Sequence, residues 1–195
     1  MKINLKLISF LVIFTLSHAL FAEDFTLAKV AELACHRIER LVVLRKIDEG
    51  YLTNFFQLKI EPLKQENSDA PRFRVKSQQF TNTENAAPGI IIDFNNEGRA
   101  LNFNVLEGTK IAGPIWPIKD PVTLTENALH YILDESIVIP DLLPYLNSLS
   151  EITINQEIID NMSLAKVKFT NTENNNVLTI FINSDGRFLH YEITP

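Results

Sequence analysis

Two glutamate–histidine pairs with the same spacing are the residues of this chain best suited to chemistry. Glu32 precedes His36 by four positions, and Glu126 precedes His130 by four positions. A spacing of four places both side chains of a pair on one face of a helix. If the two helices met across a twofold-like axis, the four side chains would offer nitrogen and oxygen ligands to Zn²⁺ or another divalent metal.

The polarity of the two helices favours a different interpretation of these pairs. Both pairs fall on the polar side of the helix that contains them, opposite its apolar stripe. A Glu–His pair in such a place is ordinarily a solvated ion pair of little energetic weight. The sequence therefore favours a solvated helix face over a metal site, and we expect no cofactor.

Two further residues are candidates for reactive groups. Cys35 is the only cysteine, so no intramolecular disulfide can form, and we expect a buried, inert thiol. It cannot act with His36, because neighbours on a helix point about 100° apart. Asp93 lies in the apolar run 90–94, where alternation places it opposite the large apolar residues. This favours an outward, solvated aspartate over a carboxylic acid of raised pKa.

A repeated hexapeptide shows how the chain is organised. FTNTEN occurs at 80–85 and again at 169–174, and the apolar pattern that follows each copy also matches. Before the hexapeptides, a shift of 94 positions aligns four residues of one segment with four of another, namely Glu32, Ala34, His36 and Ile38 with Glu126, Ala128, His130 and Ile132. We therefore predict two tandem repeats, 26–106 and 119–195, joined by a linker at 107–118.

Each repeat is predicted to contain one helix followed by a four-stranded antiparallel sheet. Apolar residues recur at helical spacing over 26–47. The second helix starts with Asp120-Pro121 and a capping-box pattern from Thr123 to Glu126. It should end near Glu135 because prolines follow. Period-two alternation and turn residues predict the strands of the first repeat at 52–60, 73–80, 90–94 and 99–105. The fold class is therefore α+β.

The C-terminal hairpin carries a family resemblance. The segment TIFINSDGRFLHYEI, residues 179–193, has an Asp-Gly corner between two alternating strands. A helix followed by such an antiparallel meander resembles the small PepSY and cystatin-like domains of exported bacterial proteins. The resemblance implies binding or inhibition rather than catalysis, and it transfers no active residue to this chain.

The N-terminal segment 1–22 has the features of a secretory signal peptide. Two lysines precede an apolar run, and small residues follow it, so cleavage is expected after Ala22, with Ala19 as the alternative. Without the two lysines the net charge changes from −6 to −8, which disfavours nucleic acid and anionic lipid as partners. We expect a periplasmic or secreted protein without a membrane span in its mature form.

Several apolar residues fall outside the predicted core pattern. Val43 and Leu44 lie off the main stripe of the first helix, and three consecutive residues, Ile137, Val138 and Ile139, follow the second helix. The linker adds three more, Ile115, Trp116 and Ile118. The favoured interpretation is that these residues pack the two repeats together. The alternative is an exposed patch around Trp116 that binds a protein partner.

The resulting functional hypothesis is an exported bacterial binding module that is not an enzyme. No HExxH, GxSxG, CxxC, Gly-rich phosphate loop or calcium loop occurs in the chain. A protein or peptide partner is expected, as for a secreted effector or an inhibitor-like protein. Two alternatives remain: a small hydrolase or isomerase with a pocket between helix and sheet, and a lipid carrier, which the 13 phenylalanines would suit. The sequence leaves the oligomeric state open.

Overall fold

The computed structural model describes residues 25–64, 72–80, 87–108, 119–159 and 162–195. The predicted signal peptide lies outside these residues. So do Ile115, Trp116 and Ile118 of the predicted linker, and the interpretation of that apolar segment stays a prediction.

Eight strands form one antiparallel sheet in the order β4-β3-β2-β1-β5-β6-β7-β8. The predicted α+β class is confirmed, but the strands make one continuous sheet instead of two four-stranded ones, because β1 pairs with β5. The strands are β1 Phe55–Pro62, β2 Phe73–Gln79, β3 Gly89–Phe94, β4 Ala100–Leu106, β5 Leu149–Ile159, β6 Met162–Asn171, β7 Val177–Asn183 and β8 Phe188–Thr194.

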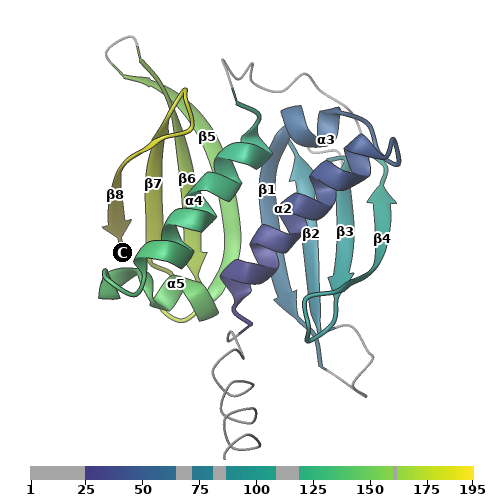
Figure 1. Cartoon of the computed structure of the whole chain (residues 1–195), viewed down its shortest axis with the longest axis horizontal. Coiled ribbons are helices and arrows are strands. Elements are labelled where there is room, and N and C mark those ends of the chain that lie inside the picture. The colour runs from purple at the N-terminus through teal and green to yellow at the C-terminus, as the bar shows by residue number, and fades with distance from the viewer. Residues whose placement is uncertain (1–24, 65–71, 81–86, 109–118, 160–161) are drawn as a thin grey trace, which may run out of the picture.

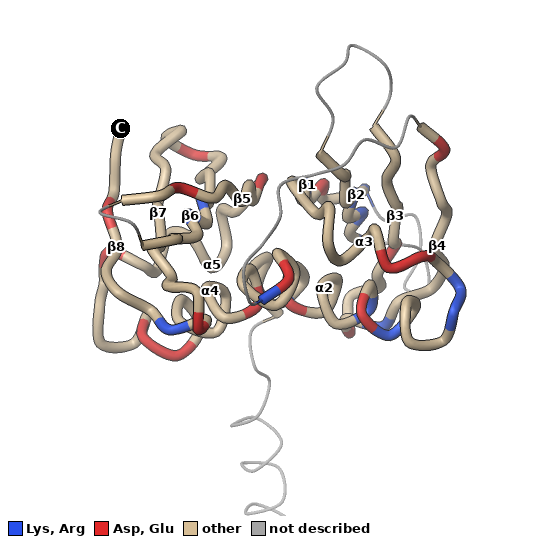
Figure 2. Tube along the Cα trace, turned by 90° about the horizontal axis from the view of Figure 1, so that it is seen from above, with Lys and Arg blue, Asp and Glu red and all other residues tan. Residues whose placement is uncertain are grey.

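Two long helices lie side by side on one face of this sheet, and the sheet curves around them (Figures 1 and 2). They are α2, Leu27–Val43, and α4, Pro121–Glu135. Short helical turns follow each of them: α3 Gly50–Thr53 after α2, and η1 Pro140–Leu142 and α5 Pro144–Asn147 after α4. Each set of four strands is thus preceded by more than the single helix that the sequence predicts.

Local hydrogen bonds determine where the long helices begin and end. The side chain of Asp120 accepts a hydrogen bond from the backbone N–H of Thr123 at 2.9 Å, so Asp120 is the N-cap of α4 and the predicted start at Asp120-Pro121 is confirmed. Thr123 lies within the first turn, so the capping box predicted from Thr123 to Glu126 does not form the N-cap. The predicted end near Glu135 is confirmed. Helix α2 ends at Val43, before the predicted boundary, because Arg45 adopts a positive φ of 55° that stops the helix.

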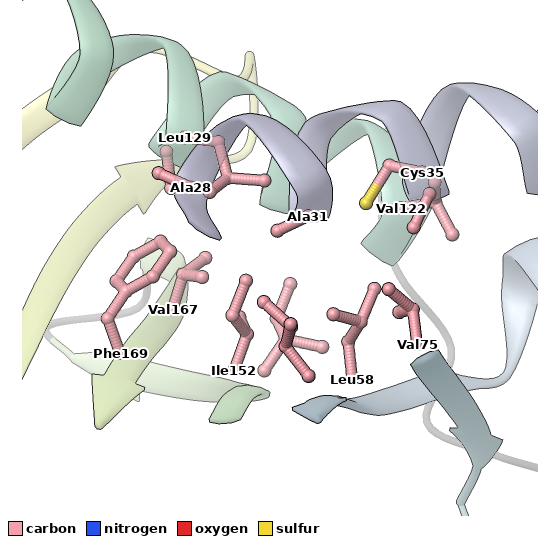
Figure 3. Packing of buried hydrophobic residues seen from close by; sticks show 14 of the residues in the cluster. Ala28, Ala31, Cys35, Leu58, Val75, Val122, Leu129, Ile152, Val167 and Phe169 are labelled. Carbon is pink, nitrogen blue, oxygen red and sulfur yellow. The ribbon is translucent and has the colours of Figure 1, made fainter. Parts of the chain in front are cut away.

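The core is a single cluster of buried apolar side chains between the helices and the sheet. In Figure 3, Ala28 and Ala31 of α2 and Leu129 of α4 lie above Leu58 of β1 and Phe169 of β6. Residues from both predicted repeats therefore share one core.

At the centre of the sheet, β1 of the first predicted repeat pairs with β5 of the second. Leu58 of β1 pairs with Ile152 of β5, a residue 94 positions further along the chain. On the two sides of this pair Gln57 faces Thr153 and Lys59 faces Glu151. Side chains also cross the junction, because Gln57 Nε2 donates to Glu151 Oε1 at 2.6 Å.

Asp93 differs from its prediction as an outward, solvated residue. It is only 5% exposed, and its carboxylate accepts hydrogen bonds from Arg74 Nε at 2.9 Å and Nη2 at 3.2 Å. The pairing raises the pKa of Arg74, chiefly through the side-chain hydrogen bond to Asp93. Alternation correctly places Asp93 on the face away from the helices, but the neighbouring strand supplies a cation that covers it.

We predict that Asp93→Ala lowers the free energy of unfolding by about 1–2 kcal/mol, because a buried, bidentate partner of Arg74 is lost. Urea denaturation followed by circular dichroism measures the change. Lys76→Ala, two residues from Arg74 on the same strand, is the matched control and should change stability by less than about 0.5 kcal/mol. Equal effects of the two substitutions would contradict this role of the Arg74–Asp93 pair.

Candidate metal centre

The four residues of the repeated Glu–His pattern meet where α2 and α4 lie side by side. His36 Nδ1 lies 3.0 Å from Glu126 Oε1, and His130 Nε2 lies 3.4 Å from Glu32 Oε1. Each histidine therefore contacts the glutamate of the other helix. The two contacts are reciprocal, since Glu32 and Glu126, like His36 and His130, are 94 positions apart.

The two carboxylates are buried, whereas the two imidazoles are accessible. Glu32 is 3% exposed and Glu126 is 8% exposed. The side chains of His36 and His130 are both 52% exposed. The prediction of a solvated helix face is therefore wrong for the glutamates, because the polar side of each helix is covered by the other helix.

Two further residues of α2 belong to this cluster, and the sequence pattern missed both. Glu39 Oε2 lies 3.9 Å from His36 Nδ1, and Lys29 Nζ lies 2.5 Å from Glu32 Oε2. Each stands three positions from a residue of the motif, a spacing that also brings helical side chains together. This spacing is the signal that could have found them.

The ligand atoms form two compact groups that share one histidine. Within each group the atoms lie within 4.8 Å of one another; the groups are Glu32, His36 and His130, and His36, Glu39 and Glu126. Ligands placed tetrahedrally about 2 Å from a Zn²⁺ ion are roughly 3.3 Å apart. The cross-helix distances of 3.0 and 3.4 Å are close to that separation.

Two buried carboxylate oxygens of the cluster lack a hydrogen bond with proper geometry. Glu32 Oε2 fails only on alignment, because the Lys29 ammonium lies 2.5 Å from it and compensates its charge. Among the described residues, Glu126 Oε1 has neither an aligned donor nor a lysine or arginine partner. Glu126 Oε1 is close to His36 Nδ1 without the alignment that a hydrogen bond requires. Burying a carboxylate without full compensation is costly, and a bound cation would remove that cost.

The electrostatics of the cluster favour a cation. The pKa of Glu126 is raised to about 8, first by burial and then by the negative charges of Glu39, Asp120 and Glu32. A positive ion placed among these carboxylates would stabilise the ionised form of Glu126. Without a bound cation, the Glu126 carboxyl group therefore holds a proton at neutral pH. A metal ion would compete with this proton for the carboxylate oxygen.

Cys35 lies beside this cluster but in the core. Its side chain is fully buried near Val122 (Figure 3), as predicted. The pKa of the thiol is raised well above its usual value, first by burial and then by Glu126. A protonated, buried thiol is neither a good nucleophile nor a good metal ligand, so the site has nitrogen and oxygen donors alone.

The apolar residues predicted to pack the repeats together are at the surface. Val43 is 79% exposed and Leu44 is 53% exposed; Ile137 and Val138, each 94 positions further along, are 88% and 75% exposed. The favoured packing interpretation is thus wrong for these four residues, because they lie at or beyond the last turn of each helix. Ile139, by contrast, is partly buried against the shared core. The alternative, contact with a protein partner, stays a prediction.

Comparison with protein-family models, with curated proteins and with solved structures gives no match for this chain. Among the described residues, no helix is long and apolar enough to cross a membrane. The resemblance to PepSY and cystatin-like domains stays a prediction, and the site has to be interpreted from its own geometry.

Proposed function

We propose that this chain is an exported binding protein whose ligand is a divalent transition metal ion, held by Glu32, His36 and His130, with Glu126 beside His36. The observation that carries the proposal is the reciprocal contact of two buried carboxylates with two accessible imidazoles across the α2–α4 interface. The proposal keeps the predicted class, a binding module without catalysis, and replaces a protein partner by a metal ion as its primary ligand.

Duplication of one unit explains why the ligands converge. In this proposal the repeats 26–106 and 119–195 pair about a pseudo-twofold axis that passes between Leu58 and Ile152 and between the two helices. In the sheet Leu58 faces its equivalent, Ile152, and between the helices the contact of His36 with Glu126 recurs as the contact of His130 with Glu32, as an axis of this kind requires. The site would then exist only where both copies are present, because each copy supplies one glutamate and one histidine.

The donor set indicates the class of metal. Imidazole nitrogens with carboxylates suit Zn²⁺, Cu²⁺ and Ni²⁺, whereas Ca²⁺ and Mg²⁺ prefer sites made of oxygen atoms. The two histidines are half exposed, so an ion can reach the site from solvent and can also leave it. These features favour reversible binding of Zn²⁺ over a closed structural site.

The alternatives need a pocket between helix and sheet. The cavity between α4 and the sheet, lined by Leu124, Gln156 and Leu164, has a volume of about 10 Å³, which is room for about one water molecule. A larger, open hollow of about 460 Å³ lies between Tyr51 of α3 and Leu106 of β4. It is large enough for a small ligand, so both alternatives stay predictions.

Isothermal titration calorimetry of chelator-stripped protein with ZnCl₂ tests the proposal. We predict one ion per chain, little heat from MgCl₂ or CaCl₂, and an affinity about 100-fold lower in the double variant His36→Ala/His130→Ala. The matched control is His190→Ala, because His190 is similarly exposed but stacks on Phe181 of the sheet. Unchanged affinity in the double variant, or an equal loss in the control, would overturn the assignment.

A further inference from the structure

Strand β4 forms one free edge of the sheet and has an unusual composition for an edge. Among the residues that the structure describes, it is the terminal strand and is hydrogen-bonded to β3 alone. Its sequence ALNFNVL contains no charged residue and no proline. Edge strands are normally protected from pairing by charges, prolines or bulges. Of these, β4 has only a register shift near its start, where Leu101 is the extra residue opposite the step from Asp93 to Phe94. Two large apolar side chains of β4, Leu101 and Val105, are 41% and 39% exposed.

The sequence around β4 is self-complementary. An antiparallel strand of the same sequence, centred on Phe103, would place like residues opposite each other: Phe103 with Phe103, Asn102 with Asn104, Leu101 with Val105, and Ala100 with Leu106. Directly opposite residues in an antiparallel pair have neighbouring side chains that stabilise the sheet. The exposed Leu101 and Val105 would cover each other in this register.

Opposite charges flank the self-complementary strand at the matching positions. Arg99 and Glu107 are both exposed, and both stand four residues from Phe103. In the same register Arg99 of one copy faces Glu107 of the other, and the contact occurs twice. Exposed ion pairs add little affinity, but they fix the register and exclude alternatives.

We propose that a second copy of this chain adds to the free edge of β4, giving a twofold-symmetric dimer with one sheet continuous through both copies. Twofold interfaces place the same surface of each copy in contact, which a self-complementary strand satisfies. The interface lies at the end of the sheet, away from the α2–α4 cluster (Figure 1). This inference is therefore independent of the proposed metal site.

The opposite edge, β8, is less suited to the same pairing. It contains His190 and Glu192, which form a contact within the strand at 3.6 Å. In a self-pairing centred on Tyr191, Arg187 would face Pro195, so no flanking ion pair would form. The ring of Phe188 is already stacked on Tyr131 of α4 at 3.8 Å.

A charge exchange tests the dimer and its register. Sedimentation equilibrium of the purified wild-type protein should give a dimer, and Arg99→Glu or Glu107→Arg alone should each weaken it by about 10-fold, since each places like charges opposite each other twice. An equimolar mixture of the two variants should recover the wild-type affinity. In that mixture every flanking contact between the two different copies is again between opposite charges.

The control variant carries its substitution on the opposite edge strand, β8. Leu189→Lys on β8 should leave the dimer unchanged, and thermal melting should show that all variants remain folded. A wild-type protein that is monomeric at about 100 μM overturns the proposal, because a specific interface should associate below that concentration. Weakening by Leu189→Lys, or failure of the mixed variants to recover affinity, also overturns it, since both would place the contact elsewhere.

Discussion

Leu58→Ala and Ile152→Ala are each expected to lower the free energy of unfolding by about 3 kcal/mol. Both side chains are completely buried, and they pair with each other where β1 meets β5. Truncating a buried aliphatic residue costs the lost transfer free energy plus the cavity left behind. The positions are equivalent across the junction, so we expect similar losses from the two substitutions.

Urea denaturation followed by far-ultraviolet circular dichroism measures both variants. A single cooperative transition is expected, because residues of both halves belong to one buried cluster. Ile158→Ala is the matched control: it lies on β5, is 70% exposed, and should cost less than about 0.5 kcal/mol. Two separate transitions, with only one shifted by each variant, would show that the halves unfold independently.

The strands and helices were largely predictable from periodicity. Side chains that alternate between core and surface produced a readable pattern, and β2 and β3 were predicted to within one residue at each end. The predicted start of β1, at residue 52, was less accurate, because the strand begins at Phe55. A register shift between Phe55 and Gln57 places Phe55 in the core where strict alternation selects Phe56. A β-bulge of this kind leaves no mark in composition.

The candidate site was half predictable, and the reason is geometric. A shift of 94 positions aligned Glu32 with Glu126 and His36 with His130, so their convergence followed from assuming that the two helices meet. Their burial did not follow. A helix has one apolar stripe facing the sheet, and this stripe contains no information about a second helix that covers part of the polar side. The partly buried carboxylates of such an interface have the same sequence pattern as a solvated face.

The second large effect that we predict is a fall in stability with rising pH, which is caused by the buried carboxyl group of Glu126. Its pKa is about 8 in the folded protein, above the ordinary value of 4.5. Below pH 4.5 both the folded and unfolded chains hold the proton. Between 4.5 and 8 the unfolded chain releases it while the folded chain retains it, so stability falls as pH rises. Above 8 both forms are ionised, and the folded chain contains an uncompensated buried charge.

Glu126→Gln should remove this decline, because glutamine has a similar shape and stays neutral. We expect the variant to exceed the wild type at pH 9 by an amount on the order of 3 kcal/mol, allowing for screening near the surface, and to match it near pH 4. Glu39, Asp120 and Glu32 face the same carboxylate but are unchanged in both proteins.

The comparison requires metal-free protein, so the pH series is measured by urea denaturation in the presence of a chelator. Glu192→Gln is the control, since this carboxylate is 58% exposed on β8; its curve should parallel that of the wild type. If the stability curve of Glu126→Gln also ran parallel to that of the wild type, solvent would reach the Glu126 carboxylate. There would then be no buried charge for a cation to compensate. If the curves diverge above pH 7, added Zn²⁺ should selectively restore the stability of the wild type at pH 9, because the ion compensates the same buried charge.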